Sequence, residues 1–285
     1  MPEGKQERIG IIGVGRMGLA MLKHLIKAGY TVTACDIDQV QLTKAADEGA
    51  GLVATPMEIA AAADFVILAV GYDDEMKAVA DGPEGLLNTM QPGSIIAVSS
   101  TVAPDTMKAL EVRAKTRDIG VFDAPIARGR LAADKGTLLA FVGGTSKVVE
   151  RALPVYRTFC SDIAHLGGVG AGQVAKAMNN FLLWVNGIAL IEAGRLSEAA
   201  GMDLVRLREA LLISSGASDA LKNWDGVSFS WALKDMQIVI DMADRAGLSL
   251  PIAGAIKELV KDGKRIKTSN PPPWTGRKPA GRLES

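Results

Sequence analysis

The sequence contains very little cysteine, histidine or aromatic side chain. Its 285 residues include two cysteines, two histidines and 5% aromatic residues. The two cysteines, Cys35 and Cys160, are far apart, so they make neither a disulfide framework nor a metal-binding pattern. His24 and His165 are too few for a histidine-based metal site. We therefore expect no bound metal, and the isolated thiols fit a reducing cytoplasm.

The chain also lacks an excess of charge of one sign and a long apolar run. Lys and Arg number 32, and Asp and Glu also number 32. Proteins held to nucleic acid by phosphate contacts are normally basic, so no nucleic-acid partner is expected. Polar residues or glycine interrupt the longest apolar stretches, at Glu58 and Asp64 and again at Asn186 and Gly187. The polar N-terminus lacks the apolar core of a signal peptide, so no membrane association is expected.

Glycine is well represented, and three glycines near the N-terminus form a Gly-x-Gly-x-x-Gly fingerprint. The fingerprint closes an apolar strand and opens a helical pattern, which is the context that dinucleotide binding requires. Gly13 allows a tight turn, Gly15 lets a pyrophosphate approach the backbone, and Gly18 lets the helix pack close to the strand. We therefore predict that the cofactor contacts lie at Gly13, Gly15, Arg16, Met17 and Gly18. The alternative is a glycine-rich turn in a fold that binds no dinucleotide.

The residue that ends the second apolar strand predicts which dinucleotide is bound. Asp36 lies about 20 residues after the glycines, where a carboxylate accepts hydrogen bonds from the adenosine ribose. The same carboxylate would repel the additional phosphate of NADP. The next residue is Ile37, at a position where an NADP enzyme often carries arginine. We therefore predict NAD as the cofactor, with NADP less favoured.

The first half of the chain alternates short apolar runs with helical patterns. Such alternation predicts a doubly wound, largely parallel sheet. The expected strands are Arg8–Ile12, Thr31–Cys35, Phe65–Val70, Ile95–Ser99, Gly120–Asp123 and Leu138–Val142. The expected helices between them are Leu19–Ala28, Gln39–Glu48, Pro56–Ala63 and Asp105–Thr116. We therefore predict an α/β Rossmann-type domain.

The second half has helical periodicity and no comparable strands. The expected helices are Gln173 to about Ala200, Leu204–Ser214, Trp231–Ala246 and Ile252–Lys264. A proline-rich segment containing Trp274 follows, which predicts an irregular tail that is either loose or pinned to the body by Trp274. The expected organisation is therefore an NAD-binding domain (1–168), a long interdomain helix (169–200), an all-α domain (201–268) and an irregular tail (269–285).

Four motifs in fixed order resemble those of the β-hydroxyacid dehydrogenase family, which includes 3-hydroxyisobutyrate dehydrogenases and tartronate semialdehyde reductases. The motifs are the glycine loop, the segments at 123–129 and 135–138, the segment at 170–180, and the stretch from Lys234 to Pro251. The resemblance extends nearly to Lys264. It implies a Rossmann domain followed by an all-α domain that usually builds a dimer, so a homodimer or homotetramer is expected. It also implies oxidation of a small 3-hydroxy acid, or reduction of the corresponding aldehyde or keto acid.

The resemblance also implies roles for individual residues. The lysine that matches Lys176 is catalytic in the family, and a positioned lysine can take or give the hydroxyl proton. Asn180 lies four residues later on the same helix face, and it is expected to bind substrate together with Asn179. Thr101 matches a threonine near the nicotinamide, although a helix-capping role fits the sequence nearly as well. The loop at Val70 should pass beneath the adenosine side of the cofactor, and Lys234 should reach the cofactor or substrate, whereas Asp235 is interpreted as structural.

One departure from the family pattern bears on the substrate. Most members have Ser-Gly-Gly after the Asp-x-Pro motif, whereas this chain has Ala127, Arg128 and Gly129. A guanidinium at this position suits a carboxylate, phosphate or sulfonate, so we expect these three residues to bind a strongly anionic substrate. Sulfolactaldehyde reductases also carry arginine here, but the apolar residues after Asn180 weaken the case for a sulfonate. Alternatively, Arg128 points to solvent or to a partner subunit.

Two other functions are compatible with this architecture. Imine reductases share it but usually lack the lysine, so Lys176 argues against that activity. A catalytically silent NAD-binding protein would have no reason to retain the glycine loop together with Asp36, Lys176 and Asn180. The leading prediction is therefore an NAD-dependent dehydrogenase or reductase of a small anionic hydroxy acid or aldehyde.

Overall fold

The computed structural model describes residues 7–276. The expectations for the first six residues and for residues 277–285 of the tail lie outside the described residues. The chain divides into two compact units, the first ending at Lys176 and the second beginning at Ala177. A single helix, α8 (Ala171–Ala199), crosses this boundary.

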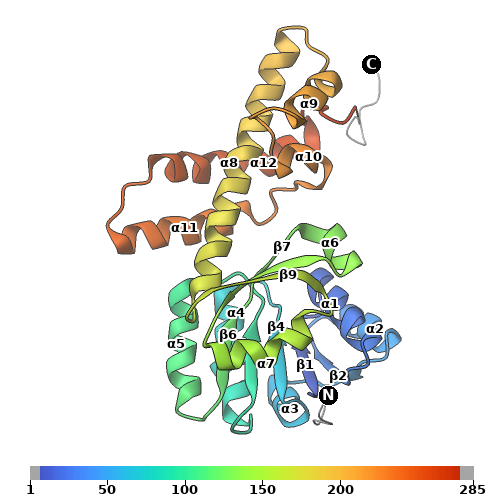
Figure 1. Cartoon of the computed structure of the whole chain (residues 1–285), viewed down its shortest axis with the longest axis vertical. Helices are drawn as coiled ribbons and strands as arrows, with labels where there is room; N and C mark the ends of the chain where they lie inside the picture. The colour runs from blue at the N-terminus through green and yellow to red at the C-terminus, as the bar shows by residue number, and fades with distance from the viewer. Residues whose placement is uncertain (1–6, 277–285) are drawn as a thin grey trace. The chain divides into compact units, whose positions relative to one another are not determined.

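A sheet of nine strands within residues 7–276 forms the centre of the first unit (Figure 1). Six strands run parallel in the order β3-β2-β1-β4-β5-β6, and β8 pairs antiparallel with β6. The strands are β1 (Ile9–Ile12), β2 (Val32–Cys35), β3 (Gly51–Leu52), β4 (Phe65–Leu68), β5 (Ile95–Val98), β6 (Gly120–Asp123), β7 (Ile126–Ala127), β8 (Leu138–Gly143) and β9 (Cys160–Gly167). The strand order reverses between β1 and β4, which is the switch point where doubly wound sheets bind ligands.

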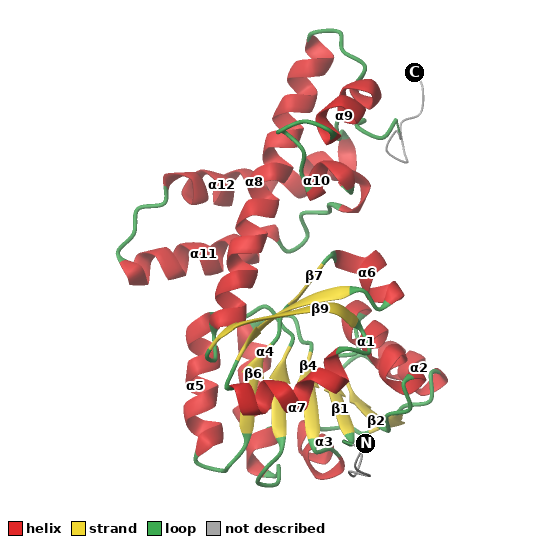
Figure 2. Cartoon of the chain, in the orientation of Figure 1, coloured by secondary structure: helices red, strands yellow, loops and turns green. Residues whose placement is uncertain are grey.

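Helices cover both faces of this sheet, because the central strands are apolar on both sides (Figure 2). In β4, Phe65 and Ile67 pack into one core layer, and Val66 and Leu68 pack into the other. The first layer includes residues of α1, α2, α6 and α7, and the second includes residues of α3, α4 and α5. These helices are α1 (Arg16–Lys27), α2 (Gln39–Asp47), α3 (Pro56–Ala62), α4 (Asp73–Asp81), α5 (Pro104–Lys115), α6 (Gly129–Lys135) and α7 (Ser146–Tyr156), with a 3-10 turn at Leu86–Asn88. The predicted Rossmann-type sheet is confirmed.

The described part of the second unit, to residue 276, consists of helices and connecting loops and contains no strand. Besides α8 it contains α9 (Leu204–Leu212), α10 (Asp219–Lys222), a 3-10 turn at Trp224–Gly226, α11 (Ala232–Ala246) and α12 (Pro251–Ser269). Trp184 of α8 packs in one core cluster with Met236 of α11 and Val260 of α12. The predicted all-α region is therefore confirmed, with its last helix longer than expected.

The start of the tail is irregular but anchored. Trp274 is fully buried, and its indole N–H donates to Leu190 O at 3.0 Å. The indole N–H of Trp224 donates to Pro272 O at 3.0 Å. A Cβ atom at Gly194 would lie 2.4 Å from Pro272 Cβ, so the glycine makes room for the proline. Of the two predicted alternatives for the tail, attachment through Trp274 is the one that the structure shows for residues 270–276.

Helix α8 is long and apolar enough to cross a membrane by length and composition. Core helices of soluble proteins meet the same criterion. In this structure Ala177, Trp184, Ile188 and Ile191 of α8 are buried against other helices of the second unit. Helix packing thus buries part of the apolar surface of α8, whereas Val174, Met178, Leu182 and Leu196 remain exposed.

Several elements were not predicted. Strand β9 is mostly exposed or half-buried and carries Ser161, Asp162 and His165, so it lacks an apolar strand pattern. Helix α7 contains Pro154, although the proline lies in its last turn, and α4 begins with three acidic residues. The predicted strand at 65–70 ends at Leu68, because the chain then turns past the glycine loop. These elements obtain their stability from tertiary contacts that local periodicity does not report.

Candidate active site

Five predicted site segments meet at one edge of the first unit's sheet. Ile12 of β1 pairs with Cys35 of β2 and Leu68 of β4, and Val98 of β5 pairs with Leu68 and with Asp123 of β6. These parallel strands therefore end together. The residues that end or follow them are Asp36, Gly13, Val70, Thr101 and Asp123, in the order of their strands across the sheet. Neighbouring strands lie ~4.8 Å apart, so this row has the scale of an extended dinucleotide.

The glycine loop follows β1 and has the form of a phosphate cradle. Gly13 has a φ of +89°, and a Cβ atom there would lie 2.7 Å from Ala69 O. A Cβ atom at Gly18 would lie 1.9 Å from Gly13 O, whereas one at Gly15 would meet nothing within 4 Å. Gly15 precedes α1, and no side chain caps that helix. Open space beside uncapped helix N–H groups suits a pyrophosphate, so the loop fits the cofactor.

Asp36 lies beside the glycine loop. Its Oδ2 accepts a hydrogen bond from Val14 N at 2.7 Å, and its Oδ1 accepts one from Asp38 N at 2.9 Å. These bonds hold the half-buried carboxylate at the end of β2, next to the turn that would carry the pyrophosphate. Ile37 is fully exposed beside it. The Asp36 carboxylate can accept hydrogen bonds from ribose hydroxyl groups, and residue 37 supplies no cation that could pair with a 2′-phosphate.

The loop after β4 lies against the glycine loop. Val70 is half-buried and follows Ala69, the residue that Gly13 approaches closely. The carboxylate of Glu75 accepts hydrogen bonds from Gly71 N at 2.8 Å and from Tyr72 N at 3.2 Å. The first turn of α4 thereby fixes the shape of this loop.

Thr101 follows β5, and it does not cap the next helix. The residue before α5 is Ala103, and Ala103 N donates at 2.9 Å to the carboxylate of Asp73, which also accepts from Thr106 Oγ1 at 2.7 Å. A residue of α4 thus holds the start of α5. The N-cap residue of α5 is Ala103 and not Thr101, and the contact of Thr101 with a nicotinamide stays a prediction.

Asp123 ends β6, and its carboxylate caps the start of α8. It is fully buried; its Oδ1 accepts from Gly170 N at 2.6 Å and its Oδ2 accepts from Gln173 N at 2.8 Å. Burial raises the pKa of Asp123 to about 6, against the lowering effect of these N–H donors. The carboxylate is therefore ionised at neutral pH, where it complements the positive end of the helix. The contact fixes the first turn of α8 to the sheet.

Lys176 lies in the second turn of α8 and is half-buried. Asn180 follows four residues later on the same helix, and only 5% of it is exposed. Asn179 Nδ2 donates to Asn180 Oδ1 at 3.0 Å, so the two predicted amides are joined to each other. The helix thus presents an amine and an oriented amide one turn apart on one face.

Arg128 is anchored within the first unit. Its Nη1 forms an ion pair with Asp162 and donates to Ser161 Oγ at 2.9 Å, both on β9. Its backbone φ is +81°, a left-handed conformation from which α6 begins at Gly129. The pairing with Arg128 lowers the pKa of Asp162. Because these contacts use Nη1, they do not occupy Nε and Nη2; Ala127 is buried, and Arg128 and Gly129 are exposed.

Two further residues predicted from the sequence, Lys234 and Asp235, lie at the start of α11 in the second unit. Lys234 is half-buried, with its Nζ 5.7 Å from the centre of the Trp231 ring. Asp235 is buried and accepts a hydrogen bond from Trp184 Nε1 at 3.0 Å. The structural role predicted for Asp235 is confirmed, since it satisfies the indole of a core tryptophan.

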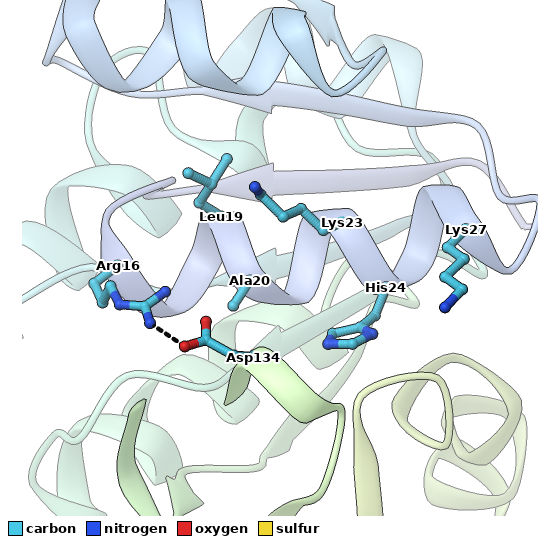
Figure 3. Close-up of a pocket in the computed structure, with 7 residues that line it drawn as sticks. All are labelled: Arg16, Leu19, Ala20, Lys23, His24, Lys27 and Asp134. Atoms are coloured by element: carbon cyan, nitrogen blue, oxygen red, sulfur yellow. Dashed lines mark hydrogen bonds and ion pairs between the residues drawn. The ribbon is translucent and has the colours of Figure 1, made fainter. Parts of the chain in front are cut away.

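A small hollow beside α1 is a separate feature (Figure 3). It has a volume of about 180 Å³ and is lined by Arg16, Leu19, Ala20, Lys23, His24, Lys27 and Asp134. Small-molecule pockets usually measure about 300–1,000 Å³, so the hollow is too small for a dinucleotide. Arg16 forms an ion pair with Asp134 of α6, and Lys23 forms one with Glu48. Arg16 and Met17 lie between Gly15 and Gly18 of the fingerprint. The side chain of Arg16 turns toward α6, and that of Met17 packs partly into the core.

Two models of known families match the chain. The NAD-binding domain of 6-phosphogluconate dehydrogenase matches residues 8–167. The NAD-binding domain of NADP-dependent 3-hydroxyisobutyrate dehydrogenase matches residues 170–269. The chain belongs to the β-hydroxyacid dehydrogenase family. It is a hydroxyacid dehydrogenase with an NAD(P)-binding domain.

Characterised relatives of this hydroxyacid dehydrogenase differ in their substrates. An NAD-dependent L-serine dehydrogenase from Pseudomonas aeruginosa is 34% identical over 224 residues, which cover 78% of this chain and 75% of the relative. A 2-(hydroxymethyl)glutarate dehydrogenase from Eubacterium barkeri is 30% identical, covering 92% and 91%. Among solved structures, the 3-hydroxyisobutyrate dehydrogenase of Mycobacterium tuberculosis with L-serine has a TM-score of 0.83 at 25% identity, covering 90% and 94%.

Sequence reasoning did not identify two residues that organise this site. Asp123 and Gln173 both lie within motifs, but neither was predicted to have a role of its own. Both are buried polar residues, with 0% and 1% of their surface exposed. Their partners lie 47 to 73 positions away in the chain, so no local pattern could reveal the pairing. The available signal was that two polar residues interrupt otherwise apolar or glycine-rich motifs.

Proposed function

We propose that the protein is an NAD-dependent dehydrogenase of a small anionic 3-hydroxy acid, or a reductase of the corresponding semialdehyde. Lys176 is the general acid/base in this proposal. The observation that carries it is the start of α8, where Asp123 fixes the helix that bears Lys176 to the same sheet edge as the glycine loop. A cofactor cradle and a candidate proton acceptor therefore belong to one compact unit.

The case for NAD rests on the end of β2. The Asp36 carboxylate is held beside the glycine loop by Val14 N, and it is placed to accept ribose hydroxyl groups. A 2′-phosphate at this position would meet the carboxylate without a compensating cation from Ile37. We infer that NAD is preferred over NADP.

The case for Lys176 rests on what the reaction requires. Bound NAD supplies the hydride acceptor at the nicotinamide. The hydroxyl proton of the substrate must leave as the carbonyl forms, and the neutral amine of Lys176 takes it; in the reverse direction the ammonium returns it. Desolvation beside a bound nicotinamide would favour the neutral, proton-accepting form. Asn180, and Asn179 bonded to it, orient the substrate hydroxyl toward this amine in our proposal.

The anionic end of the substrate is assigned to the loop at Arg128. A guanidinium offers a planar fork of donors that suits a carboxylate or sulfonate, and Nε and Nη2 form one edge of that fork. Asp162 holds the other edge and competes for the positive charge. L-Serine and 2-(hydroxymethyl)glutarate, the named substrates of two relatives, both carry a carboxylate and a hydroxyl group, which supports this assignment.

A substrate screen tests the proposed function. The purified protein is assayed for formation of reduced nicotinamide with 3-hydroxyisobutyrate, L-serine, glycerate, 3-hydroxypropionate, 4-hydroxybutyrate and dihydroxypropanesulfonate, each with NAD and with NADP. We expect turnover of at least one hydroxy acid, with NAD giving the higher kcat/KM. Tight NAD binding without turnover of any hydroxy acid would instead favour a silent binding protein. A parallel assay that follows oxidation of NADH and NADPH with a cyclic imine tests the other alternative, and turnover confined to that assay would favour an imine reductase.

A further inference from the structure

The side chain of Gln173 forms hydrogen bonds with the backbone on both sides of Thr101. We call this pair of hydrogen bonds the bracket. Gln173 lies in the first turn of α8, and only 1% of it is exposed. Its Oε1 accepts a hydrogen bond from Val102 N at 3.1 Å, and its Nε2 donates one to Ser100 O at 2.8 Å. The amide therefore pairs with the backbone on both sides of Thr101, much as a neighbouring strand would.

The backbone of Gln173 is held as firmly as its side chain. Gln173 N donates to Asp123 Oδ2 at 2.8 Å, and Asp123 ends β6. One residue thus joins the loop after β5, the end of β6 and the first turn of α8. Lys176 lies three residues farther along this helix. Its position relative to Thr101 is consequently set through Gln173.

The chemistry of the bracket explains why an amide stands here. Ser100 O needs a donor and Val102 N needs an acceptor, and the side chain must supply both from one end. Aspartate and glutamate lack the donor when ionised, and the asparagine side chain is one methylene shorter. An apolar residue would leave two buried backbone groups without their partner.

We propose that Gln173 is a positioning residue, which fixes Thr101 against the nicotinamide half of the cofactor at a set distance from Lys176. The role of Thr101 and Lys176 rests on the proposed function. Gln173 itself touches neither substrate nor cofactor in this account. It acts through the backbone of Ser100 and Val102.

The test compares two variants of similar structural severity. Q173M removes both amide bonds and keeps the length of the side chain. Y156F removes the buried hydrogen bond between Tyr156 Oη and Ser99 Oγ, which measures 2.8 Å and lies one residue before the bracketed loop. Thermal unfolding shows whether the two variants lose comparable stability. Titrations with NADH and with ADP-ribose separate the nicotinamide half of the cofactor from the adenosine half.

We expect Q173M to lower kcat by ~10- to 100-fold, because a small displacement of a positioned group lowers the rate strongly. NADH affinity should fall while ADP-ribose affinity stays unchanged, since the glycine loop and Asp36 are untouched. Y156F should keep wild-type kcat. The proposal is overturned if Q173M keeps both kcat and NADH affinity, if Y156F loses as much kcat, or if ADP-ribose affinity falls as far as NADH affinity.

A second variant keeps the proposal testable if Q173M does not fold. In Q173E the ionised carboxyl still accepts from Val102 N but repels Ser100 O, and its protonated form restores a donor. The activity of Q173E relative to wild type should therefore rise as the pH is lowered, with Asp123 present in both proteins. A ratio that does not change with pH would count against the bracket.

The same measurements separate the bracket from the proposed function. If the wild-type protein binds NADH but oxidises no hydroxy acid, the proposed function has failed. The two titrations with Q173M still decide whether Gln173 positions the nicotinamide side. Unequal losses of NADH and ADP-ribose affinity would support the bracket even then.

Discussion

The two ends of the sheet edge hold their functional groups by opposite means. At β1, the phosphate cradle is built from backbone and requires the absence of side chains: a Cβ atom at Gly18 would lie 1.9 Å from Gly13 O. At β5 and β6, the start of α8 is built from buried side chains, Asp123 and Gln173, whose hydrogen bonds are all made to backbone. The first end is therefore sensitive to added atoms, and the second to lost hydrogen bonds.

The largest effect should come from adding one methyl group to the glycine loop. Gly18→Ala places a carbon within 1.9 Å of a backbone oxygen, so α1 must move. We expect it to lose about 3 kcal/mol of stability, the upper end of typical overpacking costs, and to lose measurable NADH binding. Calorimetric melting and NADH titration would check both effects.

Gly15→Ala is the matched comparison at the same loop. A Cβ atom there meets nothing within 4 Å, and the φ of −62° suits alanine. Stability should stay unchanged, while the methyl group blocks the approach of the pyrophosphate and weakens NADH binding by roughly 10-fold or more. Normal NADH affinity in Gly15→Ala would contradict the placement of the pyrophosphate and weaken the contrast between the two ends.

A change in cofactor preference should be smaller. Ile37→Arg adds a cation beside Asp36 at a fully exposed position, where it can pair with a 2′-phosphate. We expect the ratio of kcat/KM for NADP to that for NAD to rise by about 10-fold, which corresponds to about 1.4 kcal/mol. Val112→Arg, on the exposed face of α5, is the control and should leave the ratio unchanged. An unchanged ratio in Ile37→Arg would argue against a ribose at Asp36.

Substitutions in the loop at Arg128, the proposed substrate loop, should change the KM for the hydroxy acid by between a few-fold and about 10-fold. Arg128→Ala should raise the KM for the hydroxy acid by about 10-fold with a smaller change in kcat, because it removes binding shared by substrate and transition state. Asp162→Asn should lower the KM by a few-fold, since the guanidinium loses its competing partner.

The two substrate-loop variants are interpreted together, from steady-state kinetics over a range of substrate concentrations. If both variants leave KM unchanged, Arg128 is an anchor for β9 and not a substrate ligand. Opposite shifts in KM would support Arg128 as a substrate ligand. The part of the site that is built from side chains would then include Arg128 as well as Asp123.

The contrast between the two ends also explains how much could be predicted from the sequence. The glycine loop and Asp36 were predictable, because backbone requirements impose residue types at fixed local spacing. Strands such as Phe65–Leu68 were predictable, since burial on both faces makes them continuously apolar. Gln173 was not, because its partners at Ser100 and Val102 are more than 70 positions away. Likewise, the start of α5 is held by Asp73, which lies 30 positions before its partner Ala103.

Lys176→Ala tests whether Lys176, on a helix that the sheet holds in position, is the general acid/base. The measurement is NADH affinity and turnover of the preferred hydroxy acid in the wild-type protein, in Lys176→Ala and in a surface control, Lys147→Ala. We predict that Lys176→Ala keeps nearly unchanged NADH affinity and loses turnover by ~10²-fold or more, whereas Lys147→Ala keeps wild-type turnover. Wild-type turnover in Lys176→Ala would contradict this prediction.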